Sequence, residues 1–171
     1  MSVDVSGSAP PTDEDGGRGE QGDGRVVSFL DRWSGLAFAV VVVVAGPLAL
    51  YLGREQWFTT DDWFFLAQRD LGSLDDLFRP HNQHWTTVPI VIYRLVFKAV
   101  GINHFVVYQA ICVYAHLAIV VLLRPIMLRV GVRPWIATAA LVPFAVFGAG
   151  ANNITVAFQV TLTGGLAVGL G

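Results

Sequence analysis

Two neighbouring carboxylates, Asp61 and Asp62, are the side chains in this sequence best suited to chemistry. They follow an uncharged stretch, residues 33–53, that is long enough to cross a bilayer. A carboxylate near an apolar boundary can act as a general base, because crowding and desolvation tune its ionisation. The pair therefore predicts a catalytic site. The alternative interpretation is a solvated pair of charges at the start of a helix.

Further polar side chains are candidates for binding a substrate. His81 and His84 are three positions apart and would share one face of a helix, where imidazoles bind a phosphate or a metal ion. A divalent metal is therefore a possible cofactor, although no zinc motif is present, and solvated loop histidines are the alternative. Arg69 lies in the same polar loop. Asn153 and Gln159 could donate to a sugar or a phosphate, or could cap two helices.

The composition indicates an integral membrane protein. Of 171 residues, 54% are apolar and 14% are charged, whereas soluble proteins average about 45–50% and about 25%. No Asp, Glu, Lys or Arg follows Arg133, and a net charge of -2 gives nucleic-acid binding no support. The single cysteine, Cys112, excludes a disulfide within the chain.

The distribution of charge predicts an all-α, polytopic fold with about four transmembrane helices. Residues 1–26 are rich in Gly, Ser, Pro and acidic side chains, which predicts a disordered tail. Residues 27–171 form the predicted membrane domain. Its expected spans are residues 33–53, 104–123, 135–149 and 154–171, with an outer loop over residues 54–103.

The predicted outer loop contains two helical patterns. Its aromatic residues suit a bilayer interface, and residues 62–71 could form a short helix there. Residues 87–101 begin near a proline, end at a glycine and carry Arg94 and Lys98 on one face. We expect an interfacial amphipathic helix; a spanning helix is the alternative.

Charge also predicts the orientation. Arg124, Arg129 and Arg133 lie in a short predicted linker, which marks the cytoplasmic side. The acidic loop is then outside, the amino terminus is cytoplasmic, and the plasma membrane is the expected location. Cys112 and His116 share a face of the second span and are expected to pack against another helix. Because the sequence stops within an apolar stretch, we expect a fragment of a longer protein.

The order of these parts resembles the GT-C membrane glycosyltransferases, especially the polyprenyl-phosphate-sugar-dependent branch related to protein mannosyltransferases. Residues 61–67, Asp-Asp-Trp-Phe-Phe-Leu-Ala, look like the acidic pair that opens an aromatic helix in that family's first outer loop. Residues 88–101 are similar to its amphipathic helix, and His81 or His84 would take the place of its histidine. The sequence departs from the pattern at Asp62, where a Glu is usual.

The resemblance implies transfer of a sugar from a polyprenyl-phosphate donor to an acceptor hydroxyl at the outer face of the membrane. It implies that Asp61 is the base that deprotonates the acceptor, with Asp62 as its neighbour. The implied partners are membrane lipid and the lipid-linked sugar; the sequence identifies no protein partner. A carboxylate suits this role because a hydroxyl attacking an anomeric carbon must lose its proton. The alternative is a non-catalytic multi-pass membrane subunit or a transporter fragment.

Overall fold

The computed structural model describes residues 16–81, 85–146 and 159–171. Over these ranges the chain is all-helical and contains no strand, which confirms the all-α part of the predicted fold class. The helices are α1 (Gly16–Leu52), α2 (Thr60–Ala67), α3 (Leu74–Phe78), α4 (Thr87–Val100), α5 (Phe105–Arg129), α6 (Pro134–Val146) and α8 (Val160–Leu170).

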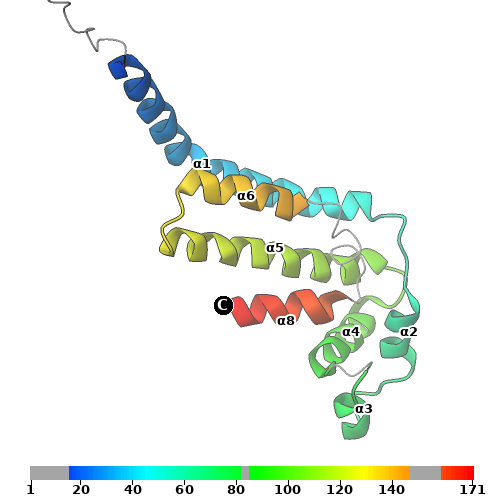
Figure 1. Cartoon of the computed structure of the whole chain (residues 1–171). Coiled ribbons are helices and arrows are strands. Elements are labelled where there is room, and N and C mark those ends of the chain that lie inside the picture. Colours follow the sequence, from blue (N-terminus) through cyan, green and yellow to red (C-terminus); the bar gives the residue numbers. More distant parts are fainter. Residues whose placement is uncertain (1–15, 82–84, 147–158) are drawn as a thin grey trace, which may run out of the picture.

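Four helices form an up-and-down bundle with α5 at its centre. Figure 1 shows α1 and α6 along one side of α5 and α8 along the other, and contacts join α5 to each of them. The short helices α2 and α3, with α4, gather where α1 ends and α5 begins. The bundle therefore has a site end, near α2, and an arginine end, at the turn from α5 to α6.

Two of the described helices are long and apolar enough to cross a membrane. They are residues Gly24–Leu52 of α1 and Phe105–Arg129, which is α5. α6 is apolar but has 13 residues and an internal proline, Pro143, and α8 has 11 residues. The crossing of a membrane by α1 and α5, and the predicted count of about four spans, stay predictions.

The first helix begins earlier than the sequence suggested. α1 starts at Gly16, within the predicted disordered tail, of which residues 1–15 lie outside the described part of the chain. Once a helix is nucleated, each added residue gains a hydrogen bond at little further cost. The apolar stretch can therefore extend the helix into polar sequence.

The central helix also runs past its predicted end, through Pro125 to Arg129. Arg124 and Arg129 thus belong to α5 rather than to a linker, and of the three arginines only Arg133 lies in the turn. Arg124 is held there by α1 and α6: its Nε donates to Thr138 Oγ1 at 3.4 Å and its Nη2 to Ser34 Oγ at 3.3 Å. These bonds were not visible in the local sequence pattern.

The apolar core divides into two clusters along α5. The cluster at the site end joins α2, α4 and α5, and the other joins α1, α5 and α6. The first cluster contains Phe58, Phe65, Leu66, Ile90, Tyr93, Phe105, Tyr108 and Cys112; the second contains Phe38, Ala45, Val113, Leu117, Val120, Leu141 and Ala145.

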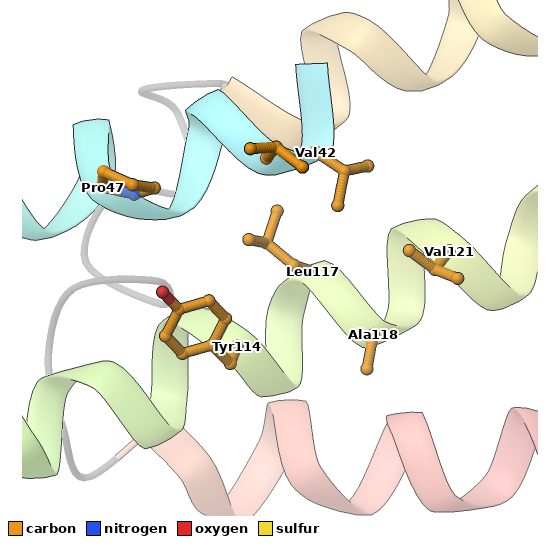
Figure 2. Close-up of a pocket in the computed structure, with 7 residues that line it drawn as sticks. Val42, Pro47, Tyr114, Leu117, Ala118 and Val121 are labelled. Atoms are coloured by element: carbon orange, nitrogen blue, oxygen red, sulfur yellow. The ribbon is translucent and has the colours of Figure 1, made fainter. Parts of the chain in front are cut away.

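A groove separates α1 and α5 on one side of the bundle. Figure 2 shows Val42 and Pro47 of α1 facing Leu117 of α5, and the cavity between the helices measures about 570 Å³. Apart from Tyr114, its lining side chains are aliphatic. The groove has no side chain suited to acid–base chemistry.

Candidate functional site

Asp62 is a structural carboxylate at the start of α2. Its side chain is fully buried, and its Oδ2 accepts hydrogen bonds from Thr59 N at 2.6 Å and Thr59 Oγ1 at 2.7 Å. Its Oδ1 accepts a short hydrogen bond from Tyr93 OH of α4. Both oxygens are therefore used to begin α2 and to attach it to α4.

Asp61, in contrast, presents its carboxylate to solvent. Its side chain is 44% exposed, and Oδ1 lies 3.3 Å from Nε2 of His81. Asp61 and Asp62 both lie in the first turn of α2, where the helix dipole favours a negative charge. Of the predicted catalytic pair, Asp61 is thus the carboxylate that an external molecule can reach.

His81 is buried between aromatic rings beside Asp61. Its ring centroid lies 4.7 Å from that of Phe64 and 5.4 Å from that of Phe65, both on α2. His81 follows α3 outside any helix, and His84 lies outside the described residues, so the predicted helical face shared by the two histidines stays a prediction. The structure brings His81 and Asp61 together from positions twenty residues apart.

Arg69 fixes the segment that leads to His81. Its guanidinium is almost fully buried and donates to the carbonyl oxygens of Asp76 at 2.9 Å, Arg79 at 3.0 Å and Pro80 at 3.3 Å. Burial, followed by the nearby Arg79 cation, lowers the pKa of Arg69. These contacts give Arg69 a positioning role; its predicted contact with a substrate stays a prediction.

Two adjacent residues of α4 hold the two ends of α2. Tyr93 binds Asp62 at the start of α2, and Arg94 Nη1 donates to the carbonyl oxygen of Leu66 at 2.6 Å near its end. A carbonyl in the last turn of a helix has no partner within the helix, so Arg94 satisfies it. The predicted helix over residues 87–101 is confirmed as α4. Its side chains bind α2 near both ends.

Burial and charge keep the Tyr93 hydroxyl protonated. The side chain is 1% exposed, and desolvation, followed by the adjacent Asp62 carboxylate, raises the pKa of Tyr93 well above its ordinary value of 10.0. A neutral phenol donates the hydrogen bond that an ionised carboxylate needs. Tyr93 and Asp62 therefore form one buried unit beneath Asp61.

The aromatic side chains of the loop divide between the core and the surface. Phe58 and Phe65 are buried in the first cluster, so they pack the site end rather than anchor it in lipid. Trp57 and Trp63 are 54% and 41% exposed. Phe78 and Trp85, later in the loop, are 52% and 74% exposed, so these four rings keep the exposure that an interfacial ring requires.

The other candidates occupy different parts of the fold. Gln159 begins α8, where its carbonyl accepts from Thr163 Oγ1 at 3.0 Å, and Asn153 lies outside the described residues. Cys112 and His116 are buried in α5 and contact Thr163 Oγ1 and the Phe144 carbonyl, at 3.6 Å and 3.1 Å. These contacts confirm the expected packing role of Cys112 and His116.

Three of the positioning residues, Thr59, Tyr93 and Arg94, were not singled out from the sequence as members of the site. Thr59 carried one usable signal, because a threonine three positions before an acidic residue is the pattern of a capping box. Tyr93 and Arg94 gave no such signal, since their contacts cross about thirty residues of chain. Their roles depend on how α4 packs against α2.

The described residues contain no group of three or more His, Cys, Asp or Glu side chains arranged to hold a metal ion. The arrangement can accept a proton at Asp61, beside an imidazole that orients the carboxylate. No protein-family model, curated protein or solved structure matches this chain.

Proposed function

We propose that the protein is a multi-pass membrane glycosyltransferase in which Asp61 is the general base. The donor is a sugar linked to a polyprenyl phosphate, and the acceptor is a hydroxyl group. One observation carries the proposal: of two adjacent carboxylates, Asp62 is bound on both oxygens while Asp61 is exposed and paired with His81. A reachable carboxylate that lies beside a fixed one is a suitable base for attack by a hydroxyl.

The proposed reaction is a single displacement. The acceptor oxygen forms a bond to the anomeric carbon while its proton passes to Asp61, and the bond from that carbon to the phosphate oxygen breaks. The polyprenyl phosphate leaves with the electron pair, and the configuration at the anomeric carbon inverts. His81 orients the Asp61 carboxylate through the 3.3 Å contact at its Nε2.

The position of Asp61 in the bundle supports chemistry at a membrane surface. Asp61 lies at the site end, a few residues beyond the last turn of α1, while Arg124, Arg129 and Arg133 lie at or beside the turn from α5 to α6, at the opposite end. Because arginines favour the cytoplasmic side, the proposal puts Asp61 at the outer face of the plasma membrane and the amino terminus in the cytoplasm.

The orientation can be tested by labelling single cysteines in intact cells with a membrane-impermeant maleimide. Arg79→Cys should react from outside, and Arg133→Cys should react only after the cells are opened. Both residues are exposed, so the two cysteines should have similar access to water on their own side of the membrane. Labelling of Arg133→Cys in intact cells would reverse the orientation.

The activity can be tested with the purified protein in vesicles and a panel of polyprenyl-phosphate-linked hexoses and pentoses. The expected result is release of polyprenyl phosphate from one donor class, lost in Asp61→Asn. Asp75→Asn is the matched control, because this carboxylate is 82% exposed on α3 at the same end of the bundle. Failure of every donor would refute the proposal and leave a non-catalytic membrane subunit, whereas full release by Asp61→Asn would remove Asp61 from the mechanism.

A further inference from the structure

We infer that a segment in the first half of α1 is an arm that lies on the surface of a bilayer containing anionic phospholipid. The arm is residues 24–33, at the arginine end of the bundle. This inference requires that α1 and α5 cross a membrane, and it goes beyond sugar transfer, with which it shares no residue.

The arm carries an apolar face that the fold leaves uncovered. Val26, Phe29, Leu30 and Trp33 are 58%, 61%, 40% and 48% exposed. Their spacing of three, four and seven positions puts them on one side of a helix, and the rings of Phe29 and Trp33 lie 6.2 Å apart. Such a stripe on a well-formed helix indicates a surface that meets an apolar medium or partner.

The length and bend of α1 carry the arm out of the bundle. The apolar part of α1, Gly24–Leu52, has 29 residues, which is about 44 Å of helix against about 30 Å of hydrocarbon. Figure 1 shows the first part of α1 projecting beyond α5 and α6 and running obliquely to the rest. Ser34 and Gly35 follow the arm, and Ser34 Oγ donates to the Asp31 carbonyl at 2.8 Å, a combination that bends helices.

Contacts at the bend fix the level at which the arm leaves the bundle. The backbone N–H of Trp135, in the first turn of α6, donates to Asp31 Oδ1 at 3.2 Å. The indoles of Trp33 and Trp135 thus belong to the same end of the bundle, and tryptophan is enriched at the boundary between lipid and water. The arm therefore starts at that boundary, and the bend turns it along the membrane surface.

The exposed arginines of this end favour an anionic surface, although two acidic residues of α1, Glu20 and Asp23, precede the arm. The arm itself has two exposed arginines, Arg25 and Arg32, while Arg129 and Arg133 are exposed on α5 and in the turn. The single acidic side chain of the arm, Asp31, is directed to Trp135. Each arginine near an anionic bilayer strengthens the attraction about fivefold, and its long stem lets the apolar face sink while the cation stays in water.

The test measures the depth of the arm with spin labels in the full chain. Labels are attached at Val26→Cys, on the apolar face, or at Ser28→Cys, on the opposite face, in a Cys112→Ala background. Power saturation then gives the accessibility of each label to oxygen, which dissolves in lipid, and to a water-soluble nickel chelate. The vesicles contain either phosphatidylglycerol or only phosphatidylcholine.

With phosphatidylglycerol, the ratio of oxygen to nickel accessibility should be several-fold higher at position 26 than at position 28. Arg25→Gln with Arg32→Gln should reduce the equilibrium constant for surface binding about 25-fold, and the ratio at position 26 should also fall in pure phosphatidylcholine. Equal ratios at the two positions, or no dependence on lipid charge, would overturn the inference. Protection of position 26 from both reagents would also overturn it and indicate a protein partner. None of these readings depends on sugar transfer.

Discussion

The two ends of the bundle use buried polar side chains in different ways. At the arginine end, Arg124 donates to Ser34 and Thr138, so the polar groups join α1, α5 and α6 to one another. At the site end, Asp62 and Tyr93 also join two helices, but the neighbouring Asp61 remains 44% exposed. The buried polar contacts of Arg124 thus only join helices, whereas those of Asp62 and Tyr93 join helices beside a carboxylate that faces outward.

The difference shows how one of two adjacent carboxylates can be made available for chemistry. A lone exposed aspartate on a short helix would move with the ends of that helix. Here α2 has eight residues, and Tyr93 and Arg94 bind near its start and its end. The buried hydrogen bonds hold α2 in place, so that Asp61 and His81 keep their separation.

The largest effect is expected from removing the buried carboxylate. Asp62→Ala takes away the acceptor for Thr59 and Tyr93 and should lower the free energy of unfolding by about 4 kcal/mol, since each bond to a charged group contributes about 1.5–3 kcal/mol. Thermal unfolding in detergent measures the loss. Asp75→Ala, at an exposed position of α3, should change stability by less than about 0.5 kcal/mol. Equal stability of the two variants would show that Asp62 does not hold α2.

A smaller effect is expected at the arginine end. Arg124→Ala removes two long hydrogen bonds and the stacking of the guanidinium 5.2 Å above Phe38, and should cost about 2 kcal/mol. Arg129→Ala is the control, because this side chain is exposed on the same helix. The comparison between ends predicts that Arg124→Ala leaves the site geometry intact. A change in the rate of sugar transfer, which depends on Asp61, would mean that the two ends are coupled.

The smallest effect at neutral pH is expected for Tyr93→Phe, at about 1.5 kcal/mol. The raised pKa of Tyr93 in the folded protein adds a dependence on pH. Above about pH 10 the unfolded phenol releases its proton while the folded phenol retains it, so stability should fall by up to about 1.4 kcal/mol per pH unit. This contribution is fully present below that pH.

The test compares thermal unfolding of the wild type, Tyr93→Phe and Tyr51→Phe between pH 8 and pH 11.5. Tyr51, which is 62% exposed, is the control. The gap between the wild type and Tyr93→Phe should narrow as the pH rises, and Tyr51→Phe should follow the wild type. A constant gap would contradict a buried, protonated phenol.

Local sequence predicted several elements of this fold well. Pro89 near its start, Gly101 after its end and the apolar periodicity between them predicted α4, and Gly101 indeed adopts a positive φ of 65° as the cap. The acidic pair was correctly expected at the start of a short helix, although α2 begins at Thr60 and ends at Ala67. These features depend on neighbouring residues, which a sequence pattern records directly.

Features that depend on packing could not be predicted. The capping pattern of Thr59 and Asp62 is readable in the sequence, but the contact of Asp62 with Tyr93, from a distant helix, is not. Arg69 looked like a binding residue because its charge is visible in the sequence, whereas its three carbonyl partners arise from the path of residues 76–80. The extension of α5 past Arg124 likewise depends on α1 and α6, which supply the partners of that guanidinium.

The most direct test of the account measures sugar transfer and thermal unfolding together in Asp61→Asn and Asp62→Asn. Asp61→Asn should unfold at the temperature of the wild type but lose about 100-fold or more of the transfer rate, as expected for removal of a general base. Asp62→Asn should lose stability and activity together. Wild-type turnover by a folded Asp61→Asn protein would contradict the account.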